Sequence, residues 1–393
     1  MDLSVDIAGI KLKSPIISSS SIDGMDGERI GLVSEFNLGA ATTKTIVKDM
    51  QTDVLPNMKM VRGGSMINCV FGTNLTADQW FNEEFPKARK AGIPIIANMA
   101  GTTPEEAVEL ARGCEAAGAS FIEYPTACPH MGNILEAMYP GLKMPLPEVN
   151  DPREYARQIE AVKKAVKIPV IAKFSAIFHL NCKTWARAVV DAGADAISAA
   201  DSIGPVIGIN IEDGQPILGG PKGYGGLTGA ALKPLVLRMV LEITEEVDVP
   251  VIGIGGVASG EDAAEYIMAG ASAVALSSSS IRNGYEVYAD VYDGLAAFMK
   301  RKGYNSLADF RGLTHTRIRE RAEQGKQILR EYVYPQRNKN RCTACGNCVM
   351  ACAYGAIEMG ESKPEFITEK CHGCGMCASV CSTQSIDHNY YPV

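Results

Sequence analysis

Residues 249–280 read VPVIGIGGVASGEDAAEYIMAGASAVALSSSS and contain one complete structural unit. An apolar, β-branched run over residues 249–257 predicts a buried strand, and the run over residues 272–280 predicts a second. Between the two runs, Ser259 can cap the start of a helix, and Gly270 can end that helix in a left-handed turn. The stretch therefore predicts a strand, a helix and a strand in succession.

The same unit recurs along the first 280 residues. Three helix-length segments end in Ala-Gly-Ala followed by Ser or Asp, at residues 117–120, 192–195 and 269–272. Short apolar runs predict eight strands, over residues 15–21, 39–46, 93–101, 119–127, 168–176, 194–202, 249–257 and 272–280. Strand–helix alternation favours a parallel sheet, and eight such units fit a closed (β/α)8 TIM barrel of the α/β class.

An open, doubly wound parallel sheet is the alternative to a closed barrel. The count of eight units and the absence of a Gly-x-Gly-x-x-Gly opening turn both favour the barrel. In a barrel, polar residues at the carboxyl ends of the strands face the active site. Those ends are therefore where catalytic and binding residues are expected.

Cysteine usage divides the chain into domains. Four of the 12 cysteines are scattered over the first 340 residues, whereas eight fall within residues 342–381. We expect a barrel over residues 1–305, a helical connector over 306–336 and a ferredoxin-like domain over 337–393. The charged connector is expected to be a solvated surface, and the alternative is a contact face for a partner subunit.

Composition narrows the classes of function. The formal net charge is −7, and Lys300-Arg301-Lys302 is an isolated basic run, so a nucleic-acid partner is disfavoured. The first six residues lack the basic start and apolar block of a signal peptide, and no apolar stretch approaches the roughly 20 residues of a membrane span. We expect a cytoplasmic protein with no membrane contact, in which the cysteines are reduced or bind metal.

The eight clustered cysteines form two runs of Cys-x2-Cys-x2-Cys-x3-Cys, which start 29 residues apart. In bacterial ferredoxins this spacing binds two [4Fe–4S] clusters, and the fourth cysteine of each run binds the cluster of the other run. The sequence therefore predicts one cluster on Cys342, Cys345, Cys348 and Cys381, and a second on Cys371, Cys374, Cys377 and Cys352. Structural zinc is the alternative, but zinc sites usually place their Cys-x2-Cys pairs farther apart.

Polar residues end several of the predicted strands. Lys44 and Lys173 each end a run, and an ammonium group in a partly buried barrel mouth needs an anionic or electron-rich partner. A reduced flavin ring is such a partner, and a surface position with the charge reaching solvent is the alternative for either lysine. Glycine-rich turns at 225–229 and 253–256 and the serine run 277–280 can form a phosphate cradle at helix starts.

These features resemble the dihydroorotate dehydrogenase superfamily, and within it the dihydropyrimidine dehydrogenases that have a barrel followed by a ferredoxin-like domain. The resemblance is carried by GGLTGAALKP at 225–234, the Cys128-Pro129 pair, the strand of Lys173 and the Gly255-Gly256 turn. It implies an FMN cofactor with its phosphate held by Gly255, Gly256, Ser277 and Ser278. It also implies that Lys44 and Lys173 contact the ring and the ribityl chain. The remaining cofactor contacts that we expect are Ser19, Asn98, Asp201 and Gly226.

The resemblance also implies roles in catalysis. In this family, a cysteine donates or accepts a proton at one substrate carbon, while the neighbouring carbon exchanges hydride, and Cys128 occupies the place of that cysteine. Lys173 would stabilise developing negative charge. A small buried apolar residue is the alternative for Cys128. His130 is expected to be a supporting loop residue and not the acid itself.

The sequence departs from the family at the substrate. The pyrimidine enzymes have asparagines at positions whose apparent counterparts in this sequence are Asp53, Pro125 and Asp201. Ionised carboxylates only accept hydrogen bonds. With Asp53, Asp201 and Ser202 as the expected substrate contacts, the site favours a substrate with several N–H donors or a positive charge.

The expected function is an oxidoreductase that reduces or forms a C=C bond next to a carbonyl in a small, heterocyclic substrate. The clusters would relay electrons to or from ferredoxin or an NAD(P)H-oxidising flavoprotein subunit, in a homodimer or hetero-oligomer. Dihydroorotate oxidation is the nearest alternative, although it predicts a basic clamp for the substrate carboxylate. An electron-transfer subunit of a larger complex and a tRNA dihydrouridine synthase are more distant candidates, and the acidic composition and ferredoxin-like tail disfavour the latter.

Overall fold

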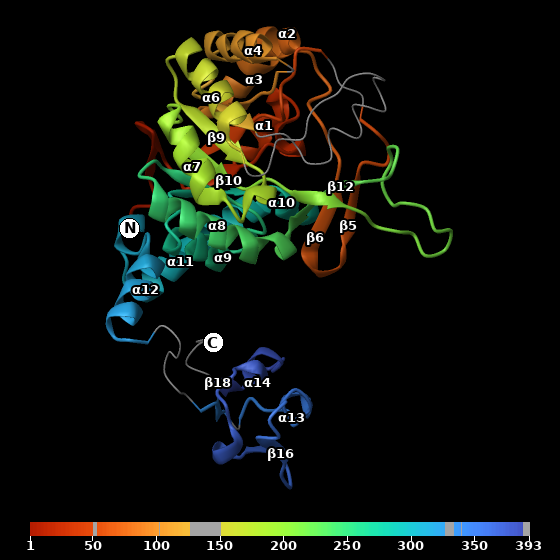
Figure 1. Cartoon of the computed structure of the whole chain (residues 1–393), viewed down its shortest axis with the longest axis vertical. Coiled ribbons are helices and arrows are strands. Elements are labelled where there is room, and N and C mark those ends of the chain that lie inside the picture. Colours follow the sequence, from red (N-terminus) through yellow and green to blue (C-terminus); the bar gives the residue numbers. More distant parts are fainter. Residues whose placement is uncertain (50–52, 102, 126–150, 327–333, 339, 388–393) are drawn as a thin grey trace. The chain divides into compact units, whose positions relative to one another are not determined.

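Eight parallel strands close into a barrel in the computed structural model of the chain (Figure 1). The structure describes residues 1–49, 53–101, 103–125, 151–326, 334–338 and 340–387. The strands in barrel order are β3 (Ile16–Ser18), β4 (Ala40–Thr42), β7 (Ile95–Asn98), β8 (Phe121–Pro125), β9 (Val170–Phe174), β10 (Ala196–Ala199), β13 (Val251–Ile254) and β14 (Ala273–Leu276). Each strand lies within one of the eight predicted runs, which confirms the (β/α)8 fold.

Burial explains why the runs are continuously apolar. Every residue of β4, β7, β9, β10, β13 and β14 is buried. One face of each strand packs in the barrel interior and the other packs under helices, so both faces require apolar side chains. The longer helices are α1 (Gly27–Val33), α4 (Pro104–Ala117), α6 (Arg153–Ala165), α7 (Cys182–Asp191), α8 (Lys233–Glu246), α9 (Gly260–Met268), α10 (Ser278–Asn283) and α11 (Glu286–Lys302).

Hydroxyl side chains cap the starts of two helices, and Ser259 does so as predicted. Thr103 accepts a hydrogen bond from the Glu106 N–H at the start of α4, and Ser259 accepts one from the Asp262 N–H at the start of α9. Gly118 ends α4 with a φ of 102°, a left-handed conformation that glycine adopts without the steric cost of a Cβ. Shorter helical segments are η1 (Ile22–Gly24), η2 (Arg62–Gly64), α2 (Ala77–Gln79), η3 (Trp80–Glu84), α3 (Phe85–Ala88), η4 (Arg89–Ala91), η5 (Ala176–Phe178), η6 (Ala230–Leu232) and η7 (Leu307–Asp309).

A second, antiparallel sheet lies beside the barrel and was not predicted (Figure 1). Its strands in order are β11 (Ile203–Val206), β12 (Gly225–Gly229), β6 (Ser65–Asn68) and β5 (Met58–Val61), and a hairpin of β1 (Val5–Ile7) and β2 (Ile10–Leu12) precedes the barrel. The prediction that residues 225–229 form a helix-opening turn was therefore wrong. They form β12, because glycine allows close pairing with β6: a Cβ on Gly225 would lie 2.7 Å from the Asn68 carbonyl oxygen. The helix begins just afterwards, at Ala230.

The chain divides into two compact units, Met1–Thr316 and Arg317–Val393, and the division falls within helix α12 (Leu313–Glu323). The second unit contains β15 (Gln336–Arg337), α13 (Asn347–Met350), β16 (Ile357–Met359), β17 (Pro364–Phe366), η8 (Thr368–Lys370), α14 (Met376–Ser379) and β18 (Ile386–Asp387). Gly346 precedes α13 and Gly375 precedes α14, with φ of 79° and 81°. The two cysteine runs thus share a local backbone conformation as well as a spacing. None of the described helices has the length and apolar character of a membrane span.

Candidate active site

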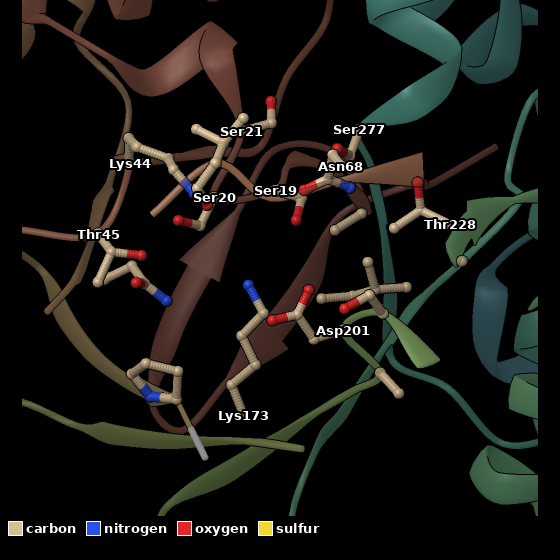
Figure 2. Close-up of a pocket in the computed structure, with 18 of the residues that line it drawn as sticks. Ser19, Ser20, Ser21, Lys44, Thr45, Asn68, Lys173, Asp201, Thr228 and Ser277 are labelled. Carbon is tan, nitrogen blue, oxygen red and sulfur yellow. The ribbon is translucent and has the colours of Figure 1, made fainter. Parts of the chain in front are cut away.

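A cavity of about 630 Å³ opens at the carboxyl ends of the barrel strands. Predicted residues that line it are Ser19, Lys44, Asn98, Lys173, Asp201, Ser202, Gly255, Gly256, Ser277 and Ser278. Figure 2 shows Lys173 and Asp201 near the centre of the view, with Lys44 and Thr45 to one side and Asn68 and Thr228 to the other. Loops far apart in the sequence meet here because all parallel strands point the same way.

Two predicted site residues do not line the described cavity. The Asp53 carboxylate accepts hydrogen bonds from the Phe71 N–H and the Asn57 amide, both at 3.0 Å. Since Phe71 does line the cavity, Asp53 supports the cavity wall through its bond to Phe71. Gly226 is paired with Asn68 in the antiparallel sheet. Cys128 and His130 lie outside the described residues.

Lys173 is buried at the base of the cavity beside an acid that the sequence pattern did not single out. Its ammonium lies 3.2 Å from Oε1 of Glu123, and both side chains are 4% exposed. Glu123 Oε1 also accepts a hydrogen bond from the Asn98 amide nitrogen at 2.6 Å, and Oε2 accepts one from the Ser198 hydroxyl at 2.8 Å. The only sequence signal for Glu123 is a charged residue in the middle of an apolar run.

Two residues that line the cavity each carry a buried polar atom. Asn98 Oδ1 and Ser20 Oγ are buried, and within the described part of the chain neither has a hydrogen-bond partner. Such atoms are rare in proteins and call for a specific partner. A flavin carries both N–H groups and polar ring substituents, so the polar character of this wall is compatible with a flavin.

A glycine turn at one end of the cavity fits a phosphate group. Gly255 and Gly256 have φ of 138° and 68°, and Gly256 is tightly enclosed: a Cβ there would lie 2.8 Å from the Lys233 Cβ and 2.9 Å from the Gly229 carbonyl oxygen. Ser277 and Ser278 line the cavity on the neighbouring strand-to-helix turn. Backbone N–H groups and hydroxyls at such turns are suited to bind phosphate oxygens.

The ionisable side chains that line the cavity include both basic and acidic groups. The described lining contains the cations Lys44 and Lys173 and the anions Asp151, Glu154 and Asp201. The Lys44 ammonium donates a hydrogen bond to the Val70 carbonyl at 3.3 Å. Burial raises the pKa of the Tyr124 hydroxyl to about 12, with smaller contributions from Glu106 and Glu154. This phenol is therefore a neutral hydrogen-bonding group near pH 7 and not a base.

The second unit brings together one of the two predicted cluster ligand sets. Cys352, Cys371, Cys374 and Cys377 line one small cavity, in agreement with a fourth ligand supplied by the other run. Cys348 packs in a hydrophobic cluster with Cys381. Among the described residues, no group of three or more His, Cys, Asp or Glu side chains is arranged to hold a single metal ion.

Backbone N–H groups point at the sulfurs of both sets. Cys352 Sγ accepts from the Ala356 N–H at 3.3 Å, and Cys381 Sγ accepts from the Ser385 N–H at 3.2 Å. Burial would raise the pKa of the Cys381 thiol, but hydrogen bonds from Ser385 and Thr383 outweigh it and lower the pKa to about 7. Thiolates stabilised in this way are the form that binds iron.

The chain combines a TIM barrel, which has a polar cavity at the carboxyl ends of its strands, with a domain that contains two cysteine runs. This combination defines a redox enzyme that carries its own iron–sulfur domain. Residues 2–299 match the dihydroorotate dehydrogenase family model, and residues 341–385 match the model of the 4Fe-4S dicluster domain. The chain belongs to the dihydroorotate dehydrogenase family. It is an oxidoreductase that acts on a CH–CH group.

The similar curated proteins carry two kinds of name. The catalytic subunit of dihydroorotate dehydrogenase B (NAD(+)) from Methanocaldococcus jannaschii is 34% identical over 318 residues, which cover 80% of this chain and 98% of that protein. The corresponding subunit from Endomicrobium trichonymphae is 32% identical over 78% of this chain and 95% of its own length. The NAD-dependent dihydropyrimidine dehydrogenase subunit PreA of Escherichia coli is 29% identical over 92% of this chain and 87% of its own length.

Proposed function

We propose that this protein is an FMN-dependent oxidoreductase with two [4Fe–4S] clusters that reduces or forms a C=C bond next to a carbonyl in a small heterocyclic substrate. The observation that carries the proposal is the buried Lys173–Glu123 ion pair at the base of a cavity that Asn98 also lines, and Asn98 Oδ1 is buried without a partner among the described residues. A cluster-binding module on the same chain supports an electron route to a second protein.

FMN in the cavity supplies a ring that exchanges a hydride with carbon and single electrons with iron–sulfur clusters. Gly255, Gly256, Ser277 and Ser278 would hold its phosphate. Ser19, Lys44 and Asn98 would contact the ring, and the Lys173 ammonium would stabilise negative charge on it. These assignments combine the family resemblance with the shape and polarity of the described wall.

Cys128 is proposed as the acid and base for the substrate carbon next to the one that exchanges hydride. A thiol with an ordinary pKa of about 8.5 can release and recover a proton near neutral pH. The proposal for this residue rests on the sequence match after strand β8 (Phe121–Pro125), since residue 128 lies outside the described part.

The substrate is proposed to be a cyclic amide. Asp201 and Ser202 offer oxygen acceptors for N–H groups, and Asn68, which also lines the cavity, offers an amide donor and acceptor. The two described lysines are already engaged with Val70 and Glu123, and the described acids outnumber them. A neutral ring therefore fits this site better than a ring that carries a carboxylate.

Dihydroorotate is the second candidate substrate, because several similar proteins are named as catalytic subunits of dihydroorotate dehydrogenase B. The extended match with PreA through the cysteine module favours a dihydropyrimidine-type substrate. Both kinds of relative are named as subunits, which supports a proposal that this protein works with a ferredoxin or an NAD(P)H-oxidising flavoprotein, as a homodimer or a hetero-oligomer.

Flavin bleaching tests the proposal. Protein prepared without oxygen would be mixed with dihydrouracil, with dihydroorotate and with a panel of saturated cyclic amides and lactams, and the absorbance of oxidised flavin would be followed. We expect bleaching by a neutral cyclic amide and little or none by dihydroorotate. Bleaching by dihydroorotate alone would replace the first candidate with the second, and a protein free of flavin would refute both.

A further inference from the structure

Four consecutive barrel strands each contribute one side chain to a buried network. Asn98 lies on β7, Glu123 on β8, Lys173 on β9 and Ser198 on β10. Glu123 is the centre, because the other three side chains all contact its carboxylate. Asn98 and Lys173 line the cavity, whereas Glu123 does not. The network therefore connects two cavity residues to an acid behind the cavity wall.

The Glu123 carboxylate fixes which way the Asn98 amide points. A carboxylate accepts hydrogen bonds, so the amide nitrogen of Asn98 must face Glu123, at 2.6 Å. The amide oxygen is then directed away from Glu123, and it is the buried atom without a partner in the described residues. The backbone of Asn98 is held as well, since its N–H donates to the Thr43 hydroxyl at 3.0 Å.

The same carboxylate offsets the charge of Lys173. An ammonium beneath a bound ring favours the negative charge that the ring gains on reduction. An acid 3.2 Å from that ammonium reduces this effect, and low exposure of both groups keeps the interaction strong. Glu123 can therefore influence both recognition of the ring and the ease with which the ring is reduced.

We propose that Glu123 is a positioning residue that orients the Asn98 amide and balances Lys173, and so sets the affinity and the reduction potential of the bound flavin. The inference rests on the proposed function, since it requires FMN in this cavity. Neither the family match nor the names of the relatives assign a role to this acid.

The test is Glu123→Gln in the full-length protein prepared without oxygen. Glutamine keeps the volume but removes the charge, and its amide can donate to Asn98, which would then turn its nitrogen toward the cavity. We expect FMN affinity, measured by titration of flavin-free protein, to fall at least about tenfold. We expect the flavin midpoint potential to become more positive, with at least about a tenfold change in the reduced-to-oxidised ratio at fixed potential, a shift of about 30 mV for two electrons.

Glu84→Gln is the matched control. Glu84 is another buried acid, 2.7 Å from the Lys87 ammonium and hydrogen-bonded to the Gly27 N–H, and it does not line the cavity. This variant should keep the affinity and the potential of the wild-type protein.

Glu123→Asp covers the case in which removal of the charge prevents folding. Aspartate keeps the charge but is one methylene shorter, so it should weaken the contact with Asn98 and lower FMN affinity several-fold. Wild-type affinity and potential in Glu123→Asp, or in folded Glu123→Gln, would overturn the inference while leaving the proposed function intact. If the wild-type protein itself bound no flavin, both would fall.

Discussion

Lys173 and Glu123 form a buried ion pair at the base of the cavity, with 3.2 Å between the ammonium and the carboxylate. A lysine at the end of an apolar run is visible, because the carboxyl ends of barrel strands carry the site, and the same rule found Asp201. Glu123 was missed because its partners come from three other strands, and only the closed barrel brings them together. Asn68 was missed because it lies on the unpredicted sheet. The bonds of Asp53 to Phe71 and Asn57 were not predicted because they depend on loop conformation.

Cys128→Ala tests the proposed acid. Without the thiol, turnover should fall by about 10² or more, since a positioned acid or base usually contributes 10²–10⁴-fold. Flavin and iron content should remain those of the wild-type protein. Cys128→Ser should also be slow, because a hydroxyl is a much weaker acid than a thiol. Wild-type turnover in Cys128→Ala would remove this residue from the mechanism.

Asp23 makes stability depend on pH. Burial raises the pKa of its carboxyl above the ordinary value of 3.8, although hydrogen bonds from Ser280 and Tyr288 oppose the shift. The folded protein thus holds this proton more tightly than the unfolded chain, so the associated stability is complete below about pH 3.8 and is lost as the pH rises through the folded pKa.

Asp23→Asn should therefore become more stable relative to wild type as the pH rises from about 4 to about 8. Ser280 and Tyr288 both donate to Oδ2, at 2.5 and 2.6 Å, and a single amide oxygen can accept both bonds. Thermal midpoints across this range measure the effect, with exposed Asp213→Asn as the control. A constant difference from wild type at all pH values would contradict the prediction.

At the scale of elements, patterns with a single physical cause were predictable. The barrel strands are apolar on both faces because both faces are buried, and the cap at Ser259 follows from the need of helix N–H groups for acceptors. The antiparallel sheet was not predictable from composition. Its β12 strand is glycine-rich, and glycine there reflects close approach to β6 instead of a turn.

Gly256→Ala tests the turn after β13. An alanine at a φ of 68° is strained by about 1–2 kcal/mol, and its Cβ would also press on Lys233 and Gly229. If the turn holds the FMN phosphate, the distortion should weaken FMN binding about tenfold or more. Gly303→Ala is the control, since it has a φ of 75° but no atom within 4 Å of the added Cβ. Equal FMN affinity in both variants would contradict a phosphate role.

At the scale of the whole molecule, the order of the two modules was readable from cysteine spacing alone. The position of the boundary was harder to read from the sequence. The two compact units meet between Thr316 and Arg317, inside α12, and this point lies within the connector that we expected over 306–336. The sequence of a surface helix with mixed charges does not indicate which unit the helix packs against. Pairing of each cysteine run with the fourth cysteine of the other remains a proposal.

Double substitutions test this pairing through iron content. Cys352→Ser with Cys371→Ser should disable one cluster and leave about four iron atoms per chain, because both ligands are assigned to the same site. Cys352→Ser with Cys342→Ser should disable both clusters and leave little iron. The reverse pattern would show that each run binds its own cluster.

We propose that one polypeptide joins a flavin in a barrel to two iron–sulfur clusters, and chemical analysis of anaerobically purified, full-length protein is the decisive test. We expect about one FMN, about eight iron atoms and about eight acid-labile sulfides per chain. Protein that contained iron and sulfide but no flavin, or flavin without iron, would contradict it.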